Sequence, residues 1–296
     1  MSSLILGGEF LIMDGAMGTE LIKRGLTQGQ PSMIWNADRP SDVLSVHRSY
    51  ADAGSDCITT NTFGGSTLML DRYGLRDRFE ELNRLAVHLA REAAEGRSFI
   101  LGDIGPCGDF LEPLGDLTDA ELADEVKRQA DVLAEAGVDG FIVETMSDSN
   151  EMHVTVSAIK AIGLPIIGSY TYERTLDTRQ TMMGTSPREA SLVAIHAGAD
   201  AIGANCGTSL SLEDYLAIGE ELQTCSHGTP ILLQPNAGTP VATADGYAYA
   251  VTPAEFAEWA IRAAALGVRI VGGCCGTTPE HIAAVAAAIK HPNGAL

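Results

Sequence analysis

The 296-residue sequence predicts an α/β protein built as a single (β/α)₈ TIM barrel, with residues 1–296 forming one domain. Three observations predict this class: eight short apolar segments rich in β-branched residues, helical patterns between them, and a fourfold internal repeat. In each repeat a glycine ends a helix, and a short apolar strand follows and closes on a polar residue or a cysteine. The repeat glycines are Gly54, Gly137, Gly198 and Gly267. An open, doubly wound sheet is the alternative, and the fourfold repeat favours the barrel.

The eight apolar segments are typical of strands that are buried on both faces, as in a parallel sheet. In chain order they cover residues 9–15, 53–61, 98–106, 136–144, 164–170, 197–205, 229–236 and 266–274. After a short helix at 15–26, helical patterns alternate with the strands at 39–53, 78–95, 118–136, 147–162, 187–196, 211–225, 253–266 and 279–290. Three of these helices begin with a proline, which a first helical turn tolerates.

The composition excludes several classes of partner. The chain has 45% hydrophobic and 20% charged residues, and its formal net charge is −20. Such an acidic surface repels nucleic acid and anionic lipid, so we expect no nucleic acid or membrane partner. No segment approaches the ~20 uninterrupted apolar residues of a spanning helix, and the first residues lack a secretory pattern. We therefore expect a cytoplasmic protein whose six cysteines are thiols and not a disulfide framework.

The active site of this fold is built at the C-terminal ends of the strands, so candidate residues can be identified there. The strand segments end on Asp14 and Gly15, Asn61, Asp103, Glu144, Tyr170, Asn205 and Cys206, Asn236, and Cys274 with Cys275. Three cysteines thus converge on one mouth. The other three, Cys57, Cys107 and Cys225, fit packing roles better, although Cys107 also follows a strand.

Cys206, Cys274 and Cys275 predict a zinc site. Adjacent cysteines on a regular strand point to opposite faces, so they can share a metal only if the strand bends. The glycines that surround the pair, Gly272, Gly273 and Gly276, permit this bend. A Zn²⁺ with three protein ligands keeps its fourth position for a substrate. The alternative is that the paired cysteines are small buried hydrophobes, or a vicinal disulfide, and that Cys206 is unrelated.

The charge of this site favours thiol chemistry. Three thiolates and Zn²⁺ sum to −1, which makes a poor Lewis acid for carbonyls but keeps a bound substrate thiol deprotonated and nucleophilic. Thiol alkylation therefore fits better than hydrolysis. The turn that begins at Asp14 offers backbone N–H groups to a carboxylate, and Glu144, with Asp14 or Asp103, offers a negative partner to an ammonium group. These groups suit an amino acid substrate.

Eight motifs give the chain a resemblance to a known family. They are DGAMGTE (14–20), HRSYADAGSD (47–56), TNTFGGS (60–66), GDIGP (102–106), ETMSD (144–148), NCG (205–207), PNAG (235–238) and GGCCGTTPEH (272–281). Together they resemble the homocysteine S-methyltransferase family over nearly the whole chain, and most closely the homocysteine-binding module of cobalamin-dependent methionine synthases. The cysteine motifs are specific in combination, whereas GDIGP or PNAG alone would be weak.

The resemblance implies a role for each matching residue. Cys206, Cys274 and Cys275 match the catalytic zinc ligands, and homocysteine thiolate takes the fourth position. Asp14, Gly15 and Ala16, with Glu144, would hold the amino acid end of homocysteine. The pocket would be lined by Asn61, Asn205 and Asn236, and the amide oxygen of Asn236 would fill the open zinc position before substrate arrives.

The methyl donor is expected to be a methyl-corrinoid. The full methionine synthase continues into folate, corrinoid and activation modules where this chain stops, so the resemblance implies methylcobalamin carried by a separate corrinoid protein. The alternative enzyme uses a small donor directly: S-methylmethionine, S-adenosylmethionine or betaine. A cationic donor would need an aromatic cage, for which Trp35, Tyr247 and Tyr249 are the loop candidates. The loop at 27–40 is a candidate lid or donor-facing surface.

Two other classes of function remain. A metal-free aldolase or isomerase barrel would need a lysine or a phosphate clamp at the mouth, but all four lysines lie in helical segments or near the C-terminal tail. A non-catalytic module that binds a thiol amino acid would keep the zinc and the pocket but lack a route for the donor. Methyl transfer assays with each class of donor distinguish this module from an enzyme.

Overall fold

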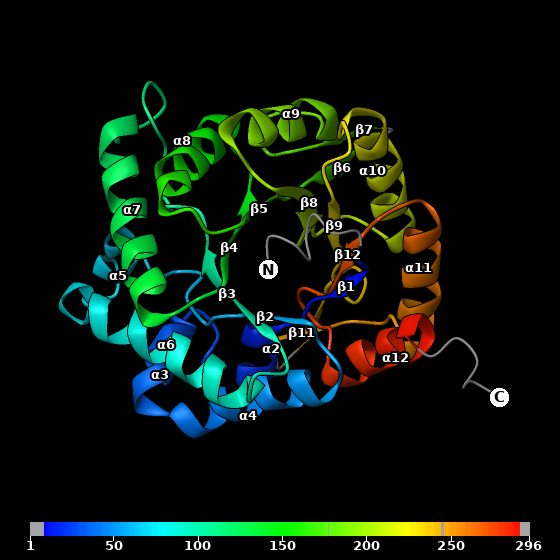
Figure 1. The fold of residues 1–296 in the computed structure, drawn as a ribbon, viewed down its shortest axis with the longest axis horizontal. Helices are drawn as coiled ribbons and strands as arrows, with labels where there is room; N and C mark the ends of the chain where they lie inside the picture. Colours follow the sequence, from blue (N-terminus) through cyan, green and yellow to red (C-terminus); the bar gives the residue numbers. More distant parts are fainter. Residues whose placement is uncertain (1–8, 177, 244–245, 291–296) are drawn as a thin grey trace.

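Eight parallel strands form one sheet in the computed structural model, which describes residues 9–176, 178–243 and 246–290 (Figure 1). The strand order is β1-β12-β9-β8-β5-β4-β3-β2, and a parallel bridge between Met13 and Cys57 joins the two end strands. The strands are β1 (Leu11–Ile12), β2 (Cys57–Thr59), β3 (Phe99–Ile104), β4 (Gly140–Met146), β5 (Ile166–Tyr170), β8 (Ala201–Asn205), β9 (Ile231–Gln234) and β12 (Ile270–Val271). The sheet therefore closes into a barrel, which confirms the predicted fold class.

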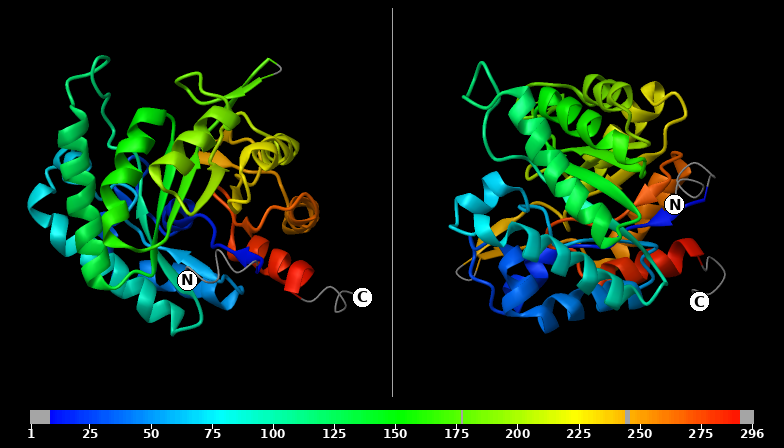
Figure 2. Two further views of the ribbon diagram at one scale, coloured as in Figure 1. Left: turned by 45° about the horizontal axis from the view of Figure 1, so that its top comes forward. Right: turned by 60° about the vertical axis from the view of Figure 1, so that its left-hand side comes forward.

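Helices surround this barrel on the outside (Figure 2). They are α2 (Met17–Lys23), α4 (Pro40–Asp52), α6 (Phe79–Ala94), α7 (Asp119–Ala136), α8 (Ser149–Ile159), α9 (Pro187–Ala197), α10 (Leu212–Cys225), α11 (Pro253–Ala265) and α12 (Pro279–Lys290). Capping boxes begin α7, α9, α10 and α11. Gly137 and Gly198 end α7 and α9 with φ values of 101° and 111°, a left-handed conformation that favours glycine, as the repeat predicts.

The inside of the barrel has an apolar layer below a polar one. The apolar layer contains buried side chains from all eight strands: Leu11, Met13, Cys57, Leu101, Ile142, Ile167, Ala201, Leu232 and Ile270. Because side chains alternate along a strand, the residues two positions further on face inward at the C-terminal mouth. On β2, β3 and β4 these residues are Thr59, Asp103 and Glu144. The pleat itself thus places polar groups under the mouth.

Several elements were not predicted from the sequence. Residues 27–40 contain η1 (Ser32–Ile34) and α3 (Trp35–Asp38), with Met33 and Trp35 buried, so the predicted loop is partly helical and packed against the core. Two antiparallel hairpins follow β5 and β9: β6 (Glu173–Thr175) with β7 (Thr178–Gln180), and β10 (Val241–Thr243) with β11 (Gly246–Ala248). Two short helical turns, α5 (Thr67–Asp71) and η2 (Arg76–Arg78), were also not predicted, whereas η3 (Lys160–Ile162) lies within the helix predicted at 147–162. The hairpin strands are only three residues long, so they lack the apolar runs used to predict strands.

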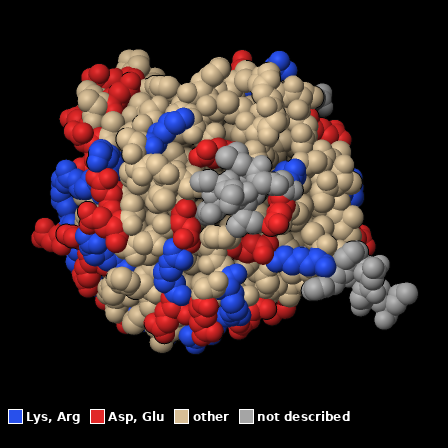
Figure 3. All heavy atoms as spheres, viewed as in Figure 1, with Lys and Arg blue, Asp and Glu red and all other residues tan. Residues whose placement is uncertain are grey.

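Charged side chains of both signs lie next to one another on the face shown in Figure 3, most densely over α4, α6 and α7. Ion pairs account for some of these neighbours: Arg84 on α6 contacts Glu80 and also Glu135 on α7, at 2.8 and 2.7 Å. Each such exposed pair contributes little stability, about 0–1 kcal/mol. Among the described residues, no helix combines the length and the apolar character that a membrane crossing requires.

Candidate functional site

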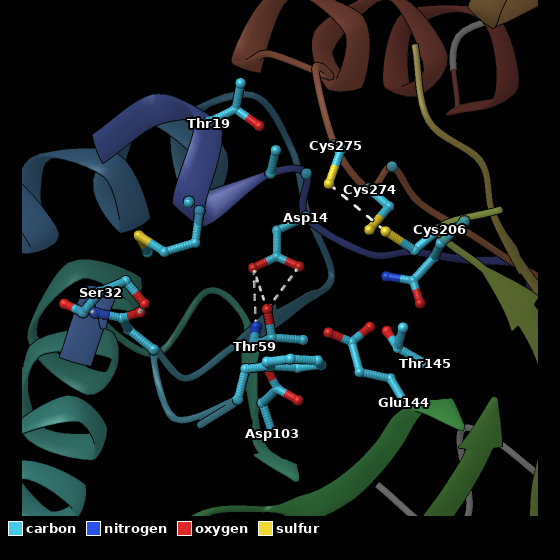
Figure 4. A pocket seen from close by; sticks show the side chains of 18 of the residues that line it. Asp14, Thr19, Ser32, Thr59, Asp103, Glu144, Thr145, Cys206, Cys274 and Cys275 are labelled. Carbon is cyan, nitrogen blue, oxygen red and sulfur yellow. Dashed lines mark hydrogen bonds between the residues drawn. The ribbon is translucent and has the colours of Figure 1, made fainter. Parts of the chain in front are cut away.

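A cavity of about 270 Å³ opens at the C-terminal ends of the strands (Figure 4). Its wall combines the turn after β1, the ends of β2, β3 and β4, and the segments after β8 and β12. The residues that line it are Asp14, Gly15, Ala16, Met17, Gly18, Thr19, Ser32, Thr59, Thr60, Asn61, Phe63, Asp103, Glu144, Thr145, Cys206, Gln234, Gly273, Cys274 and Cys275. Three thiols and three carboxylates therefore share one cavity.

The three cysteines lie together on one side of the cavity (Figure 4). All three Sγ atoms lie within 4.8 Å of one another, and Cys206 Sγ is 3.5 Å from Cys275 Sγ. Hydrogen bonds from the Cys206 and Cys274 thiols lower the pKa of Cys275 to about 3, against the opposing effect of burial. This cluster therefore stabilises a thiolate, which is the form of cysteine that binds a metal.

A bend after β12 brings the adjacent cysteines to the same side. Cys274 N–H donates to Pro235 O at 2.9 Å, and Thr277 Oγ1 donates to Cys274 O at 2.7 Å, which holds the turn. Gly276 has a φ of 79°, in the left-handed region. A Cβ on Gly272 would lie 2.5 Å from Met13 Cβ, so only glycine fits where the turn passes β1. The bend that two adjacent cysteines need in order to share a metal is thus present.

Cys206 reaches the cluster through a different backbone feature. It directly follows β8 and has a φ of 57°, an uncommon value for a residue other than glycine. Its neighbour Asn205 is fully buried, and its side chain bonds both Glu144 and Thr145. Thr145, on β4, also has a positive φ, of 60°, and the register of β4 with β5 shifts between Val143 and Met146. Unusual backbone conformations thus meet at the site.

The carboxylates face the cavity from β1, β3 and β4. Asp14 accepts hydrogen bonds from the backbone N–H and the hydroxyl of Thr59, at 2.9 and 3.0 Å, but burial still raises its pKa to about 7. Burial, together with the charges of Asp14 and Cys275, raises the pKa of Glu144 to about 8. Burial also raises the pKa of Asp103, whose Oδ1 has no hydrogen-bond partner among the described residues. The described lining includes no Lys, Arg or His.

The structure places five of the seven predicted substrate residues on the cavity wall: Asp14, Gly15, Ala16, Asn61 and Glu144. The N–H of Ala16 already donates to Thr277 Oγ1 at 3.1 Å. Asn61 is held by Ser32 and Asn36, because its Nδ2 donates to Ser32 O and to Asn36 Oδ1. Their burial at the wall makes these residues suitable contacts for a small molecule.

Asn205 and Asn236 are not among the lining residues. Asn205 makes four hydrogen bonds: it accepts from Thr145 N and Ser169 Oγ, and donates to Glu144 Oε2 and Thr145 Oγ1. These four bonds use both the oxygen and the nitrogen of the Asn205 amide, so the side chain lies behind the cavity wall and supports it. The Nδ2 of Asn236 donates to Gly207 O at 3.1 Å, and its buried Oδ1 has no partner among the described residues.

Sequence reasoning missed several lining residues. Thr59 and Gln234 are inward-facing positions of β2 and β9, and counting two residues on from the apolar layer would have found both. Ser32 and Phe63 come from irregular segments, for which the sequence gives no comparable signal. Gln234 Oε1 is buried without a partner among the described residues, so it is a free acceptor beside the cavity.

The aromatic residues considered for a cation cage do not surround the cavity. Trp35 is buried in the core with Arg39 stacked over its ring at 4.2 Å. Tyr247 is exposed on β11. Tyr249 packs its ring over Gly276, and a hydrogen bond from its hydroxyl lowers the pKa of Cys275, so it is the one candidate of the three beside the thiol cluster. Among the described lining residues, Phe63 is the one aromatic side chain. Cys57, Cys107 and Cys225 are buried away from the thiol cluster.

Comparison with known proteins identifies relatives over almost the whole chain. The family model for homocysteine S-methyltransferase matches residues 11–289. Methionine synthase of Mycobacterium tuberculosis is 34% identical in an alignment of length 309, which covers 97% of this chain and 25% of that protein. Betaine–homocysteine S-methyltransferase 1 of Danio rerio is 29% identical over 310 residues, which cover 98% of this chain and 75% of that protein. The chain thus spans about a quarter of the length of the methionine synthase that it matches.

Solved structures agree on the fold. The metallated form of the homocysteine methyltransferase MmuM from Escherichia coli superposes with a TM-score of 0.78 at 24% identity, covering 94% of this chain and 96% of that chain. At this identity the structural similarity supports the barrel fold alone.

Proposed function

This chain belongs to the homocysteine S-methyltransferase family, a family of methyltransferases, and we propose that it methylates the thiol of homocysteine to give methionine at a zinc site formed by Cys206, Cys274 and Cys275. The observation that carries the proposal is the convergence of three thiols and three carboxylates in one cavity. The thiols fit a zinc ion and a substrate sulfur, and the carboxylates fit the ammonium group of an amino acid.

The donor set fits zinc in number and kind. Three soft sulfur atoms lie within 4.8 Å of one another beside a cavity, so a fourth ligand position faces the space where substrate would bind. Bound zinc would keep the substrate thiol deprotonated near neutral pH, where a free thiol with a pKa of ~8.5 is mostly protonated. That Asn236 Oδ1 fills this position before substrate arrives stays a prediction, which its lack of a partner supports.

The carboxylates would select the amino acid end. Glu144 and Asp14 lie on the described lining without a basic residue beside them, so a positively charged ammonium group is the partner that their ionised forms require. Asn205 holds the Glu144 carboxylate through a 3.0 Å hydrogen bond, which fixes its orientation. We assign the carboxylate of homocysteine to the turn at Asp14–Thr19, whose residues all line the cavity.

The chain's own residues orient the sulfur for displacement at a methyl carbon. The homocysteine sulfur forms a bond to that carbon while the bond from carbon to donor breaks, and the electron pair of the broken bond leaves with the donor. The thiol proton is lost before this step, so it needs no general base. The apolar side chains of Phe63 and Met17, which line the cavity with the cysteines, would limit water at the sulfur, which favours transfer over side reactions.

We propose a methyl-corrinoid carried by a separate protein as the donor. A sulfonium or quaternary ammonium donor is recognised best by several aromatic faces. Phe63 is the one aromatic side chain among the described lining residues. Tyr249 adds a contact to Cys275, but Trp35 is in the core and Tyr247 points to solvent, so no cage of several aromatic faces surrounds the described lining. A methyl-corrinoid needs no such cage. A small donor is the second candidate, which the 75% coverage of the betaine-dependent relative supports.

The first experiment measures zinc content and homocysteine binding on protein purified under reducing conditions. One zinc per chain, and proton release when homocysteine binds, is the expected result, because the thiol loses its proton on ligation. Methionine formation is then compared with methylcobalamin, S-methylmethionine, S-adenosylmethionine and betaine as donors. Protein that retains wild-type activity with an empty metal site would refute the zinc assignment.

A matched pair of cysteine variants makes this test specific. Cys274→Ser is expected to abolish zinc retention and turnover together. Cys225→Ser replaces a buried cysteine of α10, outside the thiol cluster, whose Sγ donates to Leu222 O at 3.4 Å, and should retain both. Zinc binding and methionine formation without loss in Cys274→Ser would show that this cysteine is not a ligand. Zinc and homocysteine binding without transfer from any donor would favour the non-catalytic module.

A further inference from the structure

The backbone of Cys206 is strained, and the strain must be held by its surroundings. A φ of 57° is unfavourable for a residue other than glycine, and it persists only where neighbouring contacts fix it. Cys206 is the last residue before a loop, at 207–211, that leads into α10. Its own N–H makes a long 3.4 Å bond to Gln234 O. On the preceding side, Asn205 is held by its four side-chain hydrogen bonds, and on the other side the conformation depends on the residues that follow.

The β6–β7 hairpin, described at residues 173–176 and 178–180, holds this loop through the carboxylate of Glu173. The backbone N–H groups of Thr208 and Ser209 donate to Glu173 at 3.1 and 2.9 Å. The hydroxyl groups of both residues bond the same carboxylate. Four donors therefore converge on Glu173 from two consecutive residues. Although burial acts to raise it, the pKa of Glu173 is lowered by the hydrogen bonds from Ser209 and Thr208, so the carboxylate stays ionised at neutral pH.

The hairpin is itself fixed to α10, so it does not move independently of the loop. Nε of Arg179 donates to Asp214 Oδ1 at 2.9 Å, and Nη2 of Arg179 lies 2.8 Å from the same oxygen. Nη1 of Arg174 lies 3.4 Å from this oxygen. The Asp214 side chain is only 2% exposed and also caps α10 by accepting from Ser211 N at 3.0 Å. Partly buried, hydrogen-bonded ion pairs of this kind have a defined geometry.

Gly207 lies between Cys206 and the gripped residues and is held from two sides. Its N–H donates to Tyr215 Oη at 2.7 Å, and its carbonyl accepts from Asn236 Nδ2 at 3.1 Å. A Cβ at this position would collide with the carbonyl oxygen of Tyr172, which directly precedes the hairpin. Because these contacts hold the backbone of Gly207, a displacement at Glu173 would be transmitted to Cys206.

We propose that the β6–β7 hairpin, through Glu173, is a clamp that holds Cys206 in its metal-ligating conformation. Glu173 is a positioning residue, because none of the described residues of the hairpin lines the cavity. Its four hydrogen bonds fix Thr208 and Ser209, Gly207 transmits that constraint, and the Cys206 thiol remains beside Cys274 and Cys275. This inference rests on the proposed zinc site and adds to it a determinant of metal affinity outside the cavity.

The test compares zinc affinity in four proteins, measured by competition with a chromogenic chelator in the absence of homocysteine and donor. In Glu173→Ala the clamp is removed, and zinc binding should weaken about 10- to 100-fold, as for other outer-shell partners of metal ligands. In Glu173→Gln one amide oxygen still accepts, so the loss should be smaller. Glu213→Gln is the control, because it breaks an exposed ion pair of the same helix α10 with Arg262 and leaves the loop untouched.

Cobalt absorption separates positioning from a general loss of stability. The sulfur-to-cobalt charge-transfer intensity follows the number of thiolate ligands, so losing Cys206 should lower it by about one third in Glu173→Ala. Urea unfolding of each variant records global stability. Zinc affinity and cobalt spectra in both Glu173 variants that equal those of Glu213→Gln would overturn the clamp alone. Wild-type protein that binds no zinc would overturn the proposed function, and the clamp with it.

Discussion

His47 makes a large and testable contribution to the pH dependence of stability. It lies on α4 with 0% of its surface exposed, and neither ring nitrogen has a hydrogen-bond partner among the described residues. Burial lowers its pKa from 6.5 to about 3, because the charged ring would lose its hydration without gaining a counter-ion. The histidine is therefore neutral in the native state over a pH range in which the unfolded chain is protonated.

The sign and size of the effect follow from this difference. Between about pH 3 and pH 6.5 the unfolded state binds more protons, so the free energy of unfolding rises with pH in that window and is level above it. The full contribution is about 5 kcal/mol at 1.36 kcal/mol per pKa unit. At about pH 4.5, two units below the unfolded value, roughly 3 kcal/mol of stability is lost relative to neutral pH.

Urea unfolding at about pH 4.5 and about pH 7.5 measures this loss in wild type and in His47→Leu, which cannot titrate. The difference in unfolding free energy between the two pH values should be about 3 kcal/mol smaller in the variant. His88→Leu, which removes an exposed histidine of α6, is the matched control. Equal pH dependence in wild type and His47→Leu would refute the reasoning, because other titrating groups cancel in that comparison.

Three further predictions concern the cavity. Gly15→Ala should raise the KM for homocysteine about 10-fold in steady-state assays, because its Cβ would lie 2.7 Å from Thr277 Oγ1 and 2.9 Å from Tyr50 Oη and displace the turn. Asn205→Asp should lower the free energy of unfolding by about 1–3 kcal/mol in urea titrations, because a buried donor to Glu144 becomes an acceptor. Glu144→Gln should weaken homocysteine binding about 10- to 100-fold in calorimetry but leave binding of its analogue without the amino group nearly unchanged, and equal losses for both would contradict the assignment.

The strands and the thiol cluster could be predicted because both depend on short-range rules. An apolar, β-branched run ends where a polar residue or a cysteine appears, and the closed sheet then brings the strand ends together. Cys206 and Cys274 are 68 positions apart in sequence, yet their strand-end positions alone place them at one mouth. The bend at Cys275 was foreseeable for the same reason, since glycines surround it.

The roles of Asn205 and the β6–β7 hairpin could not be predicted in this way. An asparagine at a strand end can face the cavity or lie behind it, and Asn205 lies behind it because it accepts from the backbone N–H of Thr145, which has a positive φ on β4, two strands away. The hairpin has a polar sequence that is typical of a loop. Its structural role depends on the contact between the Glu173 carboxylate and Thr208. Both features are tertiary contacts that local pattern does not encode.

The charge of the cavity explains why one barrel mouth would need both a metal and an amino acid. Its described lining carries three thiols and three carboxylates without a basic residue, so ionising all of them would bury up to six negative charges. Burial instead keeps protons on the acids and raises the pKa of Asp14 to about 7 and that of Glu144 to about 8. A divalent metal would compensate the thiolates, and the ammonium group of a substrate would compensate the carboxylates. A simple thiol would satisfy only the first requirement, so the preference for an amino acid thiol would come from the carboxylates, whereas reactivity at sulfur would come from the cysteines.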